Sequence, residues 1–496
     1  MNILLIQPPI TVKRNEAFAV TPPLSLGYLA AVAEQMGHRV RILDTIVEGL
    51  GSTCAGRLIR VGLPEDAIKN EIRAFQPDLV GITCPFTLMD MEMRRVASLV
   101  KAVNPDILVA VGGAHPSSLP EYVIQDPNID FLIVGEGEKT FAELIKSVEA
   151  GEGFLNVNGL VFKKNGEVVR NPPSEFIDDL DSVPYPAWHL MSIEKYIASG
   201  QAHGSQRRKR YFPMVTSRGC PGRCVFCSIH AVWGHRWRAR SPENVVGEIE
   251  TLVSKYGIRE IHFEDDNLTL SKQRMMRICE LILERGLDIT WLTPNGVAVN
   301  TLDFGLLEKM RKSGCYQLSF GIESGDPSVL KNIIHKPLNL DRVKQIVDCS
   351  KRLGIWTHGF FVIGFPGESA ESIRRTINFA KEADFDSANF FIAAPYPGTP
   401  LYSLAASEGL IRDDFDFSKL RTMDASIDTG CFKAKDLVVL QKRAYLEFIN
   451  HRVKKEFLNG YFVIRLLRNR SPDDLSFFMQ KIKQRVIPTI GLDTSK

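Results

Sequence analysis

Three cysteines in one short stretch have the most chemically specific spacing in this chain of 496 residues. Cys220, Cys224 and Cys227 are separated by three and then by two residues. Three thiolates in one loop can bind three irons of a 4Fe–4S cube and leave the fourth iron open to a cofactor or substrate. A structural zinc site would require a fourth protein ligand, and the nearby His230 and His235 make zinc the alternative.

The other cysteines and the composition describe a reduced, water-soluble chain. Nine cysteines form an odd set without a preceding export signal, which argues against a disulfide framework. With 44% hydrophobic and 24% charged residues, the chain has room for about two to four domains. The balance of 61 basic and 58 acidic residues removes the electrostatic argument for nucleic acid. No apolar stretch reaches the roughly 18 residues of a membrane-spanning helix, so we expect a cytoplasmic protein without a transmembrane segment.

Residues 1–149 contain the elements that would build a ligand-binding sheet. Five short apolar runs alternate with helical patterns, which predicts an α/β unit with a doubly wound, Rossmann-like parallel sheet. The runs are residues 3–6, 40–43, 79–82, 107–111 and 131–134. Ligands of such sheets bind beyond the carboxyl ends of the strands, where four proline- or glycine-marked turns favour a sizeable ligand. No G-x-G-x-x-G sequence follows the first strand, so a dinucleotide is not expected.

The sequence PPLSLGYLA at 22–30, with GHRV at 37–40 and the GGAHP and VGEGE turns, resembles the cobalamin-binding domain that precedes many radical S-adenosylmethionine (SAM) enzymes. The resemblance implies a corrinoid over the sheet edge. The contacts it implies are Pro8, Pro9, Leu24, Ser25, Thr83, Gly112, Gly113, His115, Gly135, Glu136 and Gly137. The Asp-x-His-x-x-Gly sequence that supplies a cobalt ligand in other cobalamin domains is absent. We therefore expect cobalamin to bind base-off, without a histidine below the metal.

The cysteine spacing, with Phe226 before the third cysteine, is the signature of the radical SAM superfamily. The resemblance implies that the open iron chelates the amino and carboxylate groups of SAM. It also implies that a single electron, delivered by a flavodoxin- or ferredoxin-type donor, cleaves SAM to a 5′-deoxyadenosyl radical. The expected cofactors are therefore a 4Fe–4S cluster, SAM and cobalamin.

Residues 150–212 predict a hairpin and connector between two domains. Two strand-like runs, 158–162 and 167–169, flank a Lys-Lys-Asn-Gly turn, which is typical of a hairpin. A proline-marked acidic run follows. The basic run 207–210 is interpreted as a solvated loop, with attraction of an anionic substrate group as the alternative.

Residues 213–410 predict six strands with room for a helix after each: 214–216, 260–263, 289–292, 317–321, 360–364 and 389–392. Six units match the partial (β/α)6 TIM-type barrel of the radical SAM superfamily. As in the full barrel, chemistry is expected at the carboxyl ends of the strands. The SAM contacts that the resemblance implies are Phe226, Glu264, Asp265, Ser319, Glu323 and Gly364.

Substrate contacts are expected among polar and aromatic residues of the same region: Trp291, Asn295, Tyr316, His358 and Tyr396. No catalytic side chain is identified, and Tyr316 and Tyr396 are the candidates that could donate a proton or hydrogen atom. Residues 411–496 predict a basic helical region that packs on the barrel. An amphipathic helix in peripheral contact with a membrane is the alternative, which a lipid substrate would favour.

Together these features predict a C-methyltransferase that methylates an unactivated carbon of a small-molecule or lipid substrate. One SAM would methylate cobalamin to methylcobalamin, and a second would supply the 5′-deoxyadenosyl radical. Two alternatives remain: an anaerobic oxidative cyclase that forms rings without methyl transfer, as in tetrapyrrole processing, and a non-catalytic cobalamin sensor. The cysteine triad argues against the sensor. The identity of the substrate is not encoded in any recognisable motif.

Overall fold

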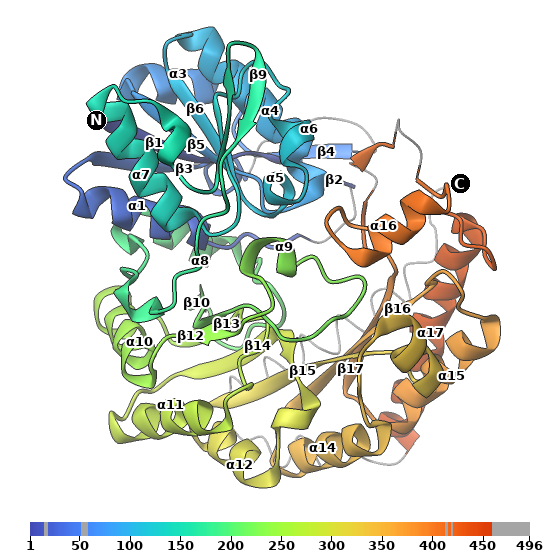
Figure 1. Ribbon diagram of the computed structural model, residues 1–496. Coiled ribbons are helices and arrows are strands. Elements are labelled where there is room, and N and C mark those ends of the chain that lie inside the picture. Colours follow the sequence, from blue (N-terminus) through green and yellow to red (C-terminus); the bar gives the residue numbers. More distant parts are fainter. Residues whose placement is uncertain (14–17, 51–57, 412–414, 418–419, 459–496) are drawn as a thin grey trace, which may run out of the picture.

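Two sheets, each covered by helices, form the framework of the molecule (Figure 1). The computed structural model describes residues 1–13, 18–50, 58–411, 415–417 and 420–458. The N-terminal unit lies above the larger C-terminal unit in Figure 1, and the short helix α9 (His230–Trp233) lies between them. This arrangement confirms the predicted α/β fold with a sheet unit followed by a partial barrel.

The N-terminal sheet contains the five predicted parallel strands. They are β1 (Asn2–Gln7), β3 (Arg39–Asp44), β5 (Leu79–Thr83), β6 (Leu108–Gly112) and β7 (Phe131–Ile133). Their spatial order is β3-β1-β5-β6-β7, so the direction of winding reverses between β1 and β5. A doubly wound sheet binds its ligand beyond the carboxyl ends of the strands, at the point where the direction of winding reverses.

Alternate side chains of β1 face two separate layers of the core. Ile3 and Leu5 pack in one apolar cluster with helices α1 (Leu24–Gln35) and α7 (Gly137–Ala150). Leu4 and Ile6 belong to the other cluster, together with residues of α3 (Glu65–Phe75) and α4 (Asp90–Val103). The two-residue period of a strand therefore buries both faces of the sheet. Smaller elements complete this unit: α2 (Thr45–Glu48), the antiparallel pair β2 (Ile10–Lys13) and β4 (Leu58–Val61), α5 (Ala114–Ser118) and α6 (Pro120–Val123).

The hairpin predicted in the connector forms, but it belongs to the N-terminal sheet. Strands β8 (Leu160–Lys164) and β9 (Glu167–Arg170) are joined by Asn165 and Gly166, which both have positive φ angles. Such a turn matches the twist of a two-residue hairpin. β8 pairs antiparallel with β7, with Leu132 opposite Val161. The sheet thus extends beyond residue 149, and its last two strands are antiparallel. The connector proper contains the short helix α8 (Ile193–Ser199).

The C-terminal unit has six parallel strands in chain order, as predicted. They are β10 (Tyr211–Met214), β13 (Glu260–Phe263), β14 (Thr290–Val297), β15 (Cys315–Glu323), β16 (Trp356–Ile363) and β17 (Ser387–Ile392). The first strand begins three residues before the predicted 214–216. The helices between them are α10 (Pro242–Tyr256), α11 (Lys272–Glu284), α12 (Phe304–Lys312), α13 (Pro327–Val329) with the π-turn Leu330–Ile334, α14 (Leu340–Arg352) and α15 (Ala370–Glu382). Because β10 and β17 do not pair, the barrel is open.

The described part of the C-terminal region packs on the barrel. After α16 (Pro400–Ser407), helix α17 (Ala434–Leu458) lies against β17 and α15 and buries Leu437, Ala444 and Phe448. This is the predicted packing of a C-terminal helix. The basic residues predicted beyond 458 lie outside the described residues. Among the described residues, no helix is both long and apolar enough to cross a membrane.

Four buried charges join the two units beside the cysteine loop. Strands β11 (Ser217–Arg218) and β12 (Arg238–Ala239) form an antiparallel ribbon in which Arg218 lies opposite Arg238. Arg218 donates to Glu138 at the start of α7, and Arg238 forms an ion pair of 2.6 Å with Glu136. All four side chains are at most 9% exposed. Burial alone would raise the pKa of Glu138, but the charge of Arg218 holds it below its ordinary value.

These contacts predict the stability of variants. Glu138→Leu leaves Arg218 buried with only the more distant Glu136, 3.7 Å away, so the free energy of unfolding should fall by about 3 kcal/mol. The double variant Glu138→Leu, Arg218→Met should recover most of that loss, because neither charge is then buried alone. As a matched control, Glu308→Leu removes an exposed pair with Lys312 and should cost less than about 1 kcal/mol. Urea denaturation of the four proteins measures these differences. An equal loss for Glu138→Leu and Glu308→Leu would contradict the inferred role of the buried pair.

Candidate functional site

The three cysteines lie in a loop that the β11–β12 ribbon closes at its base. Cys220, Cys224 and Cys227 are half-buried, and none is in a disulfide. Burial raises the pKa of the Cys224 and Cys227 thiols, that of Cys227 to about 12. Binding of iron by Cys224 and Cys227 would therefore release the protons of these two thiols. Three sulfur donors in one partly exposed loop, with Asn267 Nδ2 3.9 Å from Cys220 Sγ, fit an iron–sulfur cluster.

The two histidines of the zinc alternative contact the backbone of the cysteine loop. Nε2 of His230 lies 3.0 Å from the carbonyl oxygen of Cys220, and Nδ1 of His235 lies 3.3 Å from that of Gly222. Their rings stack on each other with centroids 3.7 Å apart. Among the described residues, no three cysteine, histidine or acidic side chains converge on a single ion. The contacts with the carbonyl oxygens of the loop therefore account for the positions of both histidines, and a zinc ion is not needed to explain them.

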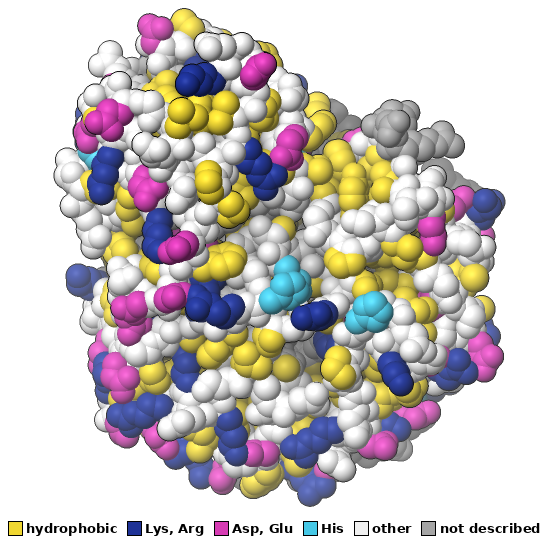
Figure 2. Space-filling model, in the orientation of Figure 1, with side chains coloured by type: hydrophobic (Ala, Val, Ile, Leu, Met, Phe, Trp, Pro, Cys, Tyr) yellow, Lys and Arg dark blue, Asp and Glu magenta, His cyan; other side chains and the backbone are white. Residues whose placement is uncertain are grey.

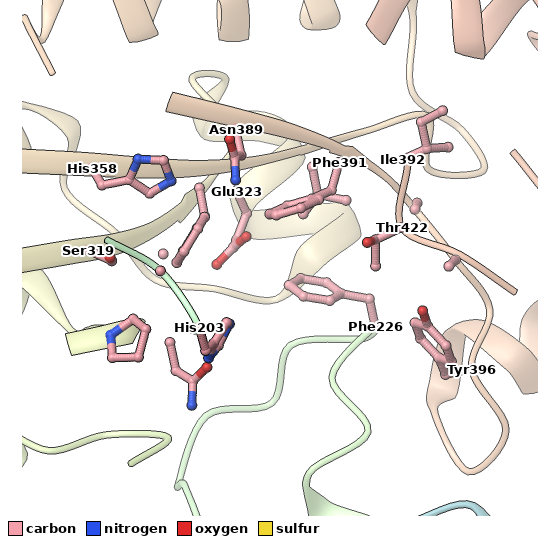
Figure 3. Close-up of a pocket in the computed structure, with 18 of the residues that line it drawn as sticks. His203, Phe226, Ser319, Glu323, His358, Asn389, Phe391, Ile392, Tyr396 and Thr422 are labelled. Atoms are coloured by element: carbon pink, nitrogen blue, oxygen red, sulfur yellow. The ribbon is translucent and has the colours of Figure 1, made fainter. Parts of the chain in front are cut away.

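A cavity of about 650 Å³ lies at the carboxyl ends of the barrel strands, next to this loop (Figure 3). Among the residues implied for SAM, three line it: Phe226, Ser319 and Glu323. Among the expected substrate contacts, Asn295, His358 and Tyr396 line it as well. Figure 3 shows Phe226 from the cysteine loop and Glu323 from β15 turned toward the same space. The structure therefore brings together six side chains from five parts of the sequence.

Glu323 is held in an unusual backbone conformation at the end of β15. Its φ of +68° lies in the left-handed region, which a non-glycine residue adopts at a cost of about 1–3 kcal/mol. Its carboxylate accepts a hydrogen bond of 2.9 Å from Lys336 Nζ. Burial would lower the pKa of Lys336, but the charge of Glu323 raises it above its ordinary value. A strained, ion-paired carboxylate at a cavity wall suits the binding of a polar cofactor group.

Other predicted residues lie outside the cavity for identifiable reasons. Asp265 is buried and accepts hydrogen bonds from Thr216 and Ser217, so it braces the strand before the cysteines. The carboxylate of Glu264 is hydrogen-bonded to the ring of His203. The backbone N–H of Gly364 donates to the carboxylate of Glu368. Trp291 is fully buried and donates to the Ser313 carbonyl. The Tyr316 hydroxyl donates to buried Glu260 at 2.7 Å. Asp265, Gly364, Trp291 and Tyr316 therefore do not line the cavity, and their expected direct contacts stay predictions.

Sequence reasoning missed His203, Asn389 and Thr422, which also line the cavity. His203 belongs to the connector, and its Nδ1 lies 2.9 Å from a carboxylate oxygen of Glu264. The Glu264 carboxylate raises the pKa of His203, although burial acts in the opposite direction. A connector residue carries no motif, so only the fold brings it to the site. Asn389 stands on a predicted strand, and alternation along that strand could have placed it inward.

A second pocket, of about 300 Å³, lies at the carboxyl ends of the N-terminal strands. Seven of the eleven residues implied for cobalamin line it: Leu24, Ser25, Thr83, Gly112, Gly113, Gly135 and Gly137. Thr83 and Gly112 are paired across β5 and β6, next to the reversal point. Gly113 has a φ of +116°, and a Cβ there would meet the Cys84 backbone at 2.7 Å. The backbone at Gly113 therefore forms part of the pocket wall, and a side chain at this position would clash with the backbone of Cys84.

Four residues implied for cobalamin do not line this pocket. His115 is buried in α5, where its Nε2 lies 3.1 Å from Asp90 and its ring packs near Phe417. The ring therefore does not line the pocket, and its expected contact with cobalamin stays a prediction. Glu136 is engaged by Arg238 and by the backbone of Ile177. Pro8 and Pro9 are buried at the end of β1, and Pro9 packs against Gly62.

The cysteine loop and its flanks form a wall of both cavities. Phe226, inside the loop, lines the barrel cavity, whereas Arg218, Val232 and Trp233 line the pocket of the N-terminal sheet. Arg218, which sequence reasoning also missed, lies 4.8 Å from the Trp233 ring centroid and 5.5 Å from that of Tyr28. All of these residues lie within 218–233 or contact that segment, so a cluster held by Cys220, Cys224 and Cys227 would lie in the segment that borders both cavities.

Comparison with known proteins agrees with this arrangement. The B12 binding domain family matches residues 11–145, and the Radical SAM superfamily matches residues 214–380. An uncharacterized methyltransferase of Pyrococcus horikoshii is 36% identical over 90% of this chain and 92% of its own length. The cytidylyl-2-hydroxyethylphosphonate methyltransferase of Streptomyces wedmorensis is 35% identical over 83% of this chain and 82% of its own. An anaerobic magnesium-protoporphyrin IX monomethyl ester cyclase of Rubrivivax gelatinosus is 29% identical, covering 84% and 72%.

Solved structures share the fold at lower identity. The cobalamin-dependent enzyme OxsB, solved with aqua-cobalamin and SAM, superposes with a TM-score of 0.70 at 18% identity, covering 99% of this chain and 72% of that one. The methyltransferase TsrM of Kitasatospora setae superposes with a TM-score of 0.67 at 20% identity, covering 83% and 77%. The cofactors of this chain are thus a 4Fe–4S cluster, SAM and cobalamin. The chain belongs to the family of cobalamin-dependent radical SAM methyltransferases.

Proposed function

We propose that this enzyme methylates an unactivated carbon of a small-molecule substrate held in the barrel cavity. When bound, the cluster with SAM would supply a 5′-deoxyadenosyl radical that removes a substrate hydrogen atom, and cobalamin would supply the methyl group. The observation that carries this proposal is the shared wall: the cysteine loop borders the barrel cavity through Phe226 and the cobalamin pocket through Val232 and Trp233. A substrate in the barrel cavity is then within reach of both sources.

The residues that line the barrel cavity divide into two groups under this proposal. Phe226, Ser319 and Glu323 would hold SAM, and the charge of Glu323 suits an ammonium or a ribose hydroxyl. Asn295, His358 and Tyr396 would hold the substrate from the facing walls. Between the two tyrosine candidates for a proton or hydrogen-atom donor, this geometry favours Tyr396, because the Tyr316 hydroxyl is buried against Glu260.

The cyclase reaction is the second candidate, since a cyclase relative covers most of this chain. Both reactions would use the same barrel cavity, so they differ in the fate of the methyl group. Two substrate classes follow from the names of these relatives. The methyltransferase of Streptomyces wedmorensis is named for a phosphonate, and the cyclase of Rubrivivax gelatinosus is named for a tetrapyrrole.

We predict that methyl-labelled SAM transfers its label to the product. The reconstituted enzyme, a chemical reductant and candidate acceptors should yield product heavier by the labelled methyl group, as measured by mass spectrometry. One 5′-deoxyadenosine and one S-adenosylhomocysteine should form per methylation, because two SAM molecules are used. Cys224→Ser should abolish 5′-deoxyadenosine while cobalamin remains bound, which its visible absorption reports. An oxidised or cyclised product without label would reject methylation and favour the cyclase reaction.

We predict that Gly112→Leu weakens cobalamin binding without unfolding the protein. Gly112 ends β6 at the pocket, and a Cβ there would lie at an ordinary 3.7 Å from the Ile133 carbonyl oxygen. A leucine would therefore fit the sheet but fill ligand space, and the Kd for cobalamin should rise about tenfold or more. Gly153→Leu is the matched control, because nothing lies within 4 Å of its Cβ position. Absorption titration with cobalamin and a thermal melt measure both effects. Unchanged affinity in Gly112→Leu would place cobalamin elsewhere.

A further inference from the structure

Gln317 is a buried side chain of the barrel cavity whose hydrogen-bonding capacity the protein leaves unused. It lies on β15, is 3% exposed and lines the cavity. Its Oε1 atom is buried and accepts no hydrogen bond from any residue that the structure describes. A buried carbonyl oxygen without a partner destabilises the folded protein, because burial removes its hydrogen bonds to water. Such an atom in a cavity wall points to a ligand group that supplies the missing donor.

Gln317 lies at the inner end of the cavity. Alternate residues of β15 face the interior of the barrel, and Gln317, Ser319 and Glu323 all line the cavity. Two residues of a strand span about 6–7 Å, so Gln317 lies that much nearer to the amino ends of the strands than Ser319. The hydroxyl of the adjacent Tyr316 donates to the carbonyl oxygen of Ser205 at 3.2 Å, which brings the connector to the same end. A ligand that reaches Gln317 therefore extends deep into the barrel.

The side chains near this end combine aromatic rings with polar groups. Ser319 is paired with His358 across β15 and β16, and the ring of His358 lies edge-on to that of Phe360, with centroids 4.8 Å apart. Asn389, which is opposite Phe360 on β17, adds a second carboxamide to the cavity wall. Figure 3 shows Ser319 and His358 at one end of the cavity and Tyr396 at the other. Flat rings beside carboxamides suit a planar ligand group with a polar edge.

Charged side chains are scarce in the cavity. Among the described residues, no lysine or arginine lines it, and Glu323 is its only carboxylate. Glu323 pairs with Lys336, and His203 pairs with Glu264, which follows the carboxyl end of β13. Figure 2 shows that Lys, Arg, Asp and Glu side chains are instead spread over the outer surface of both units. An ionised ligand group beside Gln317 would be buried without a counterion, so a neutral donor fits this end better.

We propose that Gln317 determines substrate specificity by accepting a hydrogen bond, at Oε1, from an uncharged N–H group at the inner end of the substrate. The chemical class that fits is a lactam-like ring or a planar amide, which combines an N–H donor with a flat, neutral body. The inference rests on the proposed function, since it takes the barrel cavity as the substrate site. The carbon to be methylated would then lie toward the cysteine loop, where Phe226 lines the same cavity. A site built to bind an N–H group rejects analogues that lack it, because the buried acceptor is left unpaired.

We predict that 2-pyridone, a planar lactam, binds about tenfold more tightly than N-methyl-2-pyridone, whose donor is blocked, because one neutral hydrogen bond is lost. Both probes are titrated into the full protein, reconstituted with cluster, cobalamin and SAM, and the Kd is measured by ligand-observed NMR. Reductant is omitted so that SAM stays intact. Gln317→Leu should bind the two probes with similar Kd values, because leucine is close to glutamine in volume and has no acceptor.

Two further variants and a thermal melt separate recognition from a structural role. Gln317→Glu keeps an acceptor oxygen in either protonation state and should keep the preference for 2-pyridone. Gln345→Leu makes the matched substitution at an exposed position of α14 and should leave both Kd values unchanged. Without a probe, Gln317→Leu should melt at the wild-type temperature or above it, because it removes a buried acceptor that lacks a partner. A lower melting temperature would indicate a structural role for Gln317 and would overturn the proposal.

The binding data can also contradict the proposal directly. Equal Kd values of the two probes for the wild-type protein would overturn it. A higher Kd for SAM in Gln317→Leu would overturn it as well, because Gln317 would then belong to the SAM site. Failure of the proposed methylation is a separate outcome: it would appear as missing label in the product, whereas the preference for 2-pyridone, measured without turnover, would persist.

Discussion

The arrangement of both cofactor sites depends on two buried arginines that face each other across one short ribbon. Arg218 and Arg238 close the cysteine loop, and each pairs with a glutamate just before or within the start of α7 in the other unit. Burying four charges costs several kcal/mol per ion unless every charge keeps its partner. A slide of one unit against the other would separate the pairs, so the charges restrict the two units to one relative position. These ion pairs contribute mainly to the relative orientation of the two units. Apolar residues of similar size could contribute as much to the free energy of unfolding.

This constraint explains how one loop can border two cavities. The glutamates belong to the VGEGE turn, whose glycines line the cobalamin pocket, and the arginines belong to the segment that carries the cysteines. The ion pairs therefore fix the position of the cysteine loop relative to the pocket of the N-terminal sheet, because they join the two motifs directly. Inside the barrel, Asp265 adds a second brace, because its buried carboxylate accepts bonds from Thr216 and Ser217 immediately before the loop. The loop is thus held from both sides while its outer surface remains open to solvent.

Sequence patterns predicted the parts of this structure that depend on local order. Strand periodicity identified the eleven parallel strands seen in the described part of the chain. The cysteine spacing identified the cluster loop, since three ligands within eight residues need no distant partner. Most of the pocket glycines were found because turns at strand ends are local as well. The features that the sequence did not place share one physical cause, which is that their positions depend on contacts with residues far away along the chain. His115 turns toward Asp90, 25 residues earlier, and Asp265 serves Thr216, 49 residues earlier. The hairpin turn was predictable, but its pairing with β7 was not.

The surface cations also show that a local sequence pattern and the folded structure can differ. The basic run 207–210 is the densest cluster of cations before the cysteines, yet the Arg208 and Arg210 side chains within it form ion pairs. Backbone N–H groups of Arg207 and Arg208 donate to Glu260, while the Arg208 and Arg210 side chains pair with Asp288 and Glu194. Arg223 and Lys331 are isolated in the sequence, more than 100 residues apart, and the fold brings their segments together without a carboxylate partner in the described residues. A run of like charges in sequence therefore does not identify an electrostatic surface, because only cations left unpaired after folding project a field into solvent.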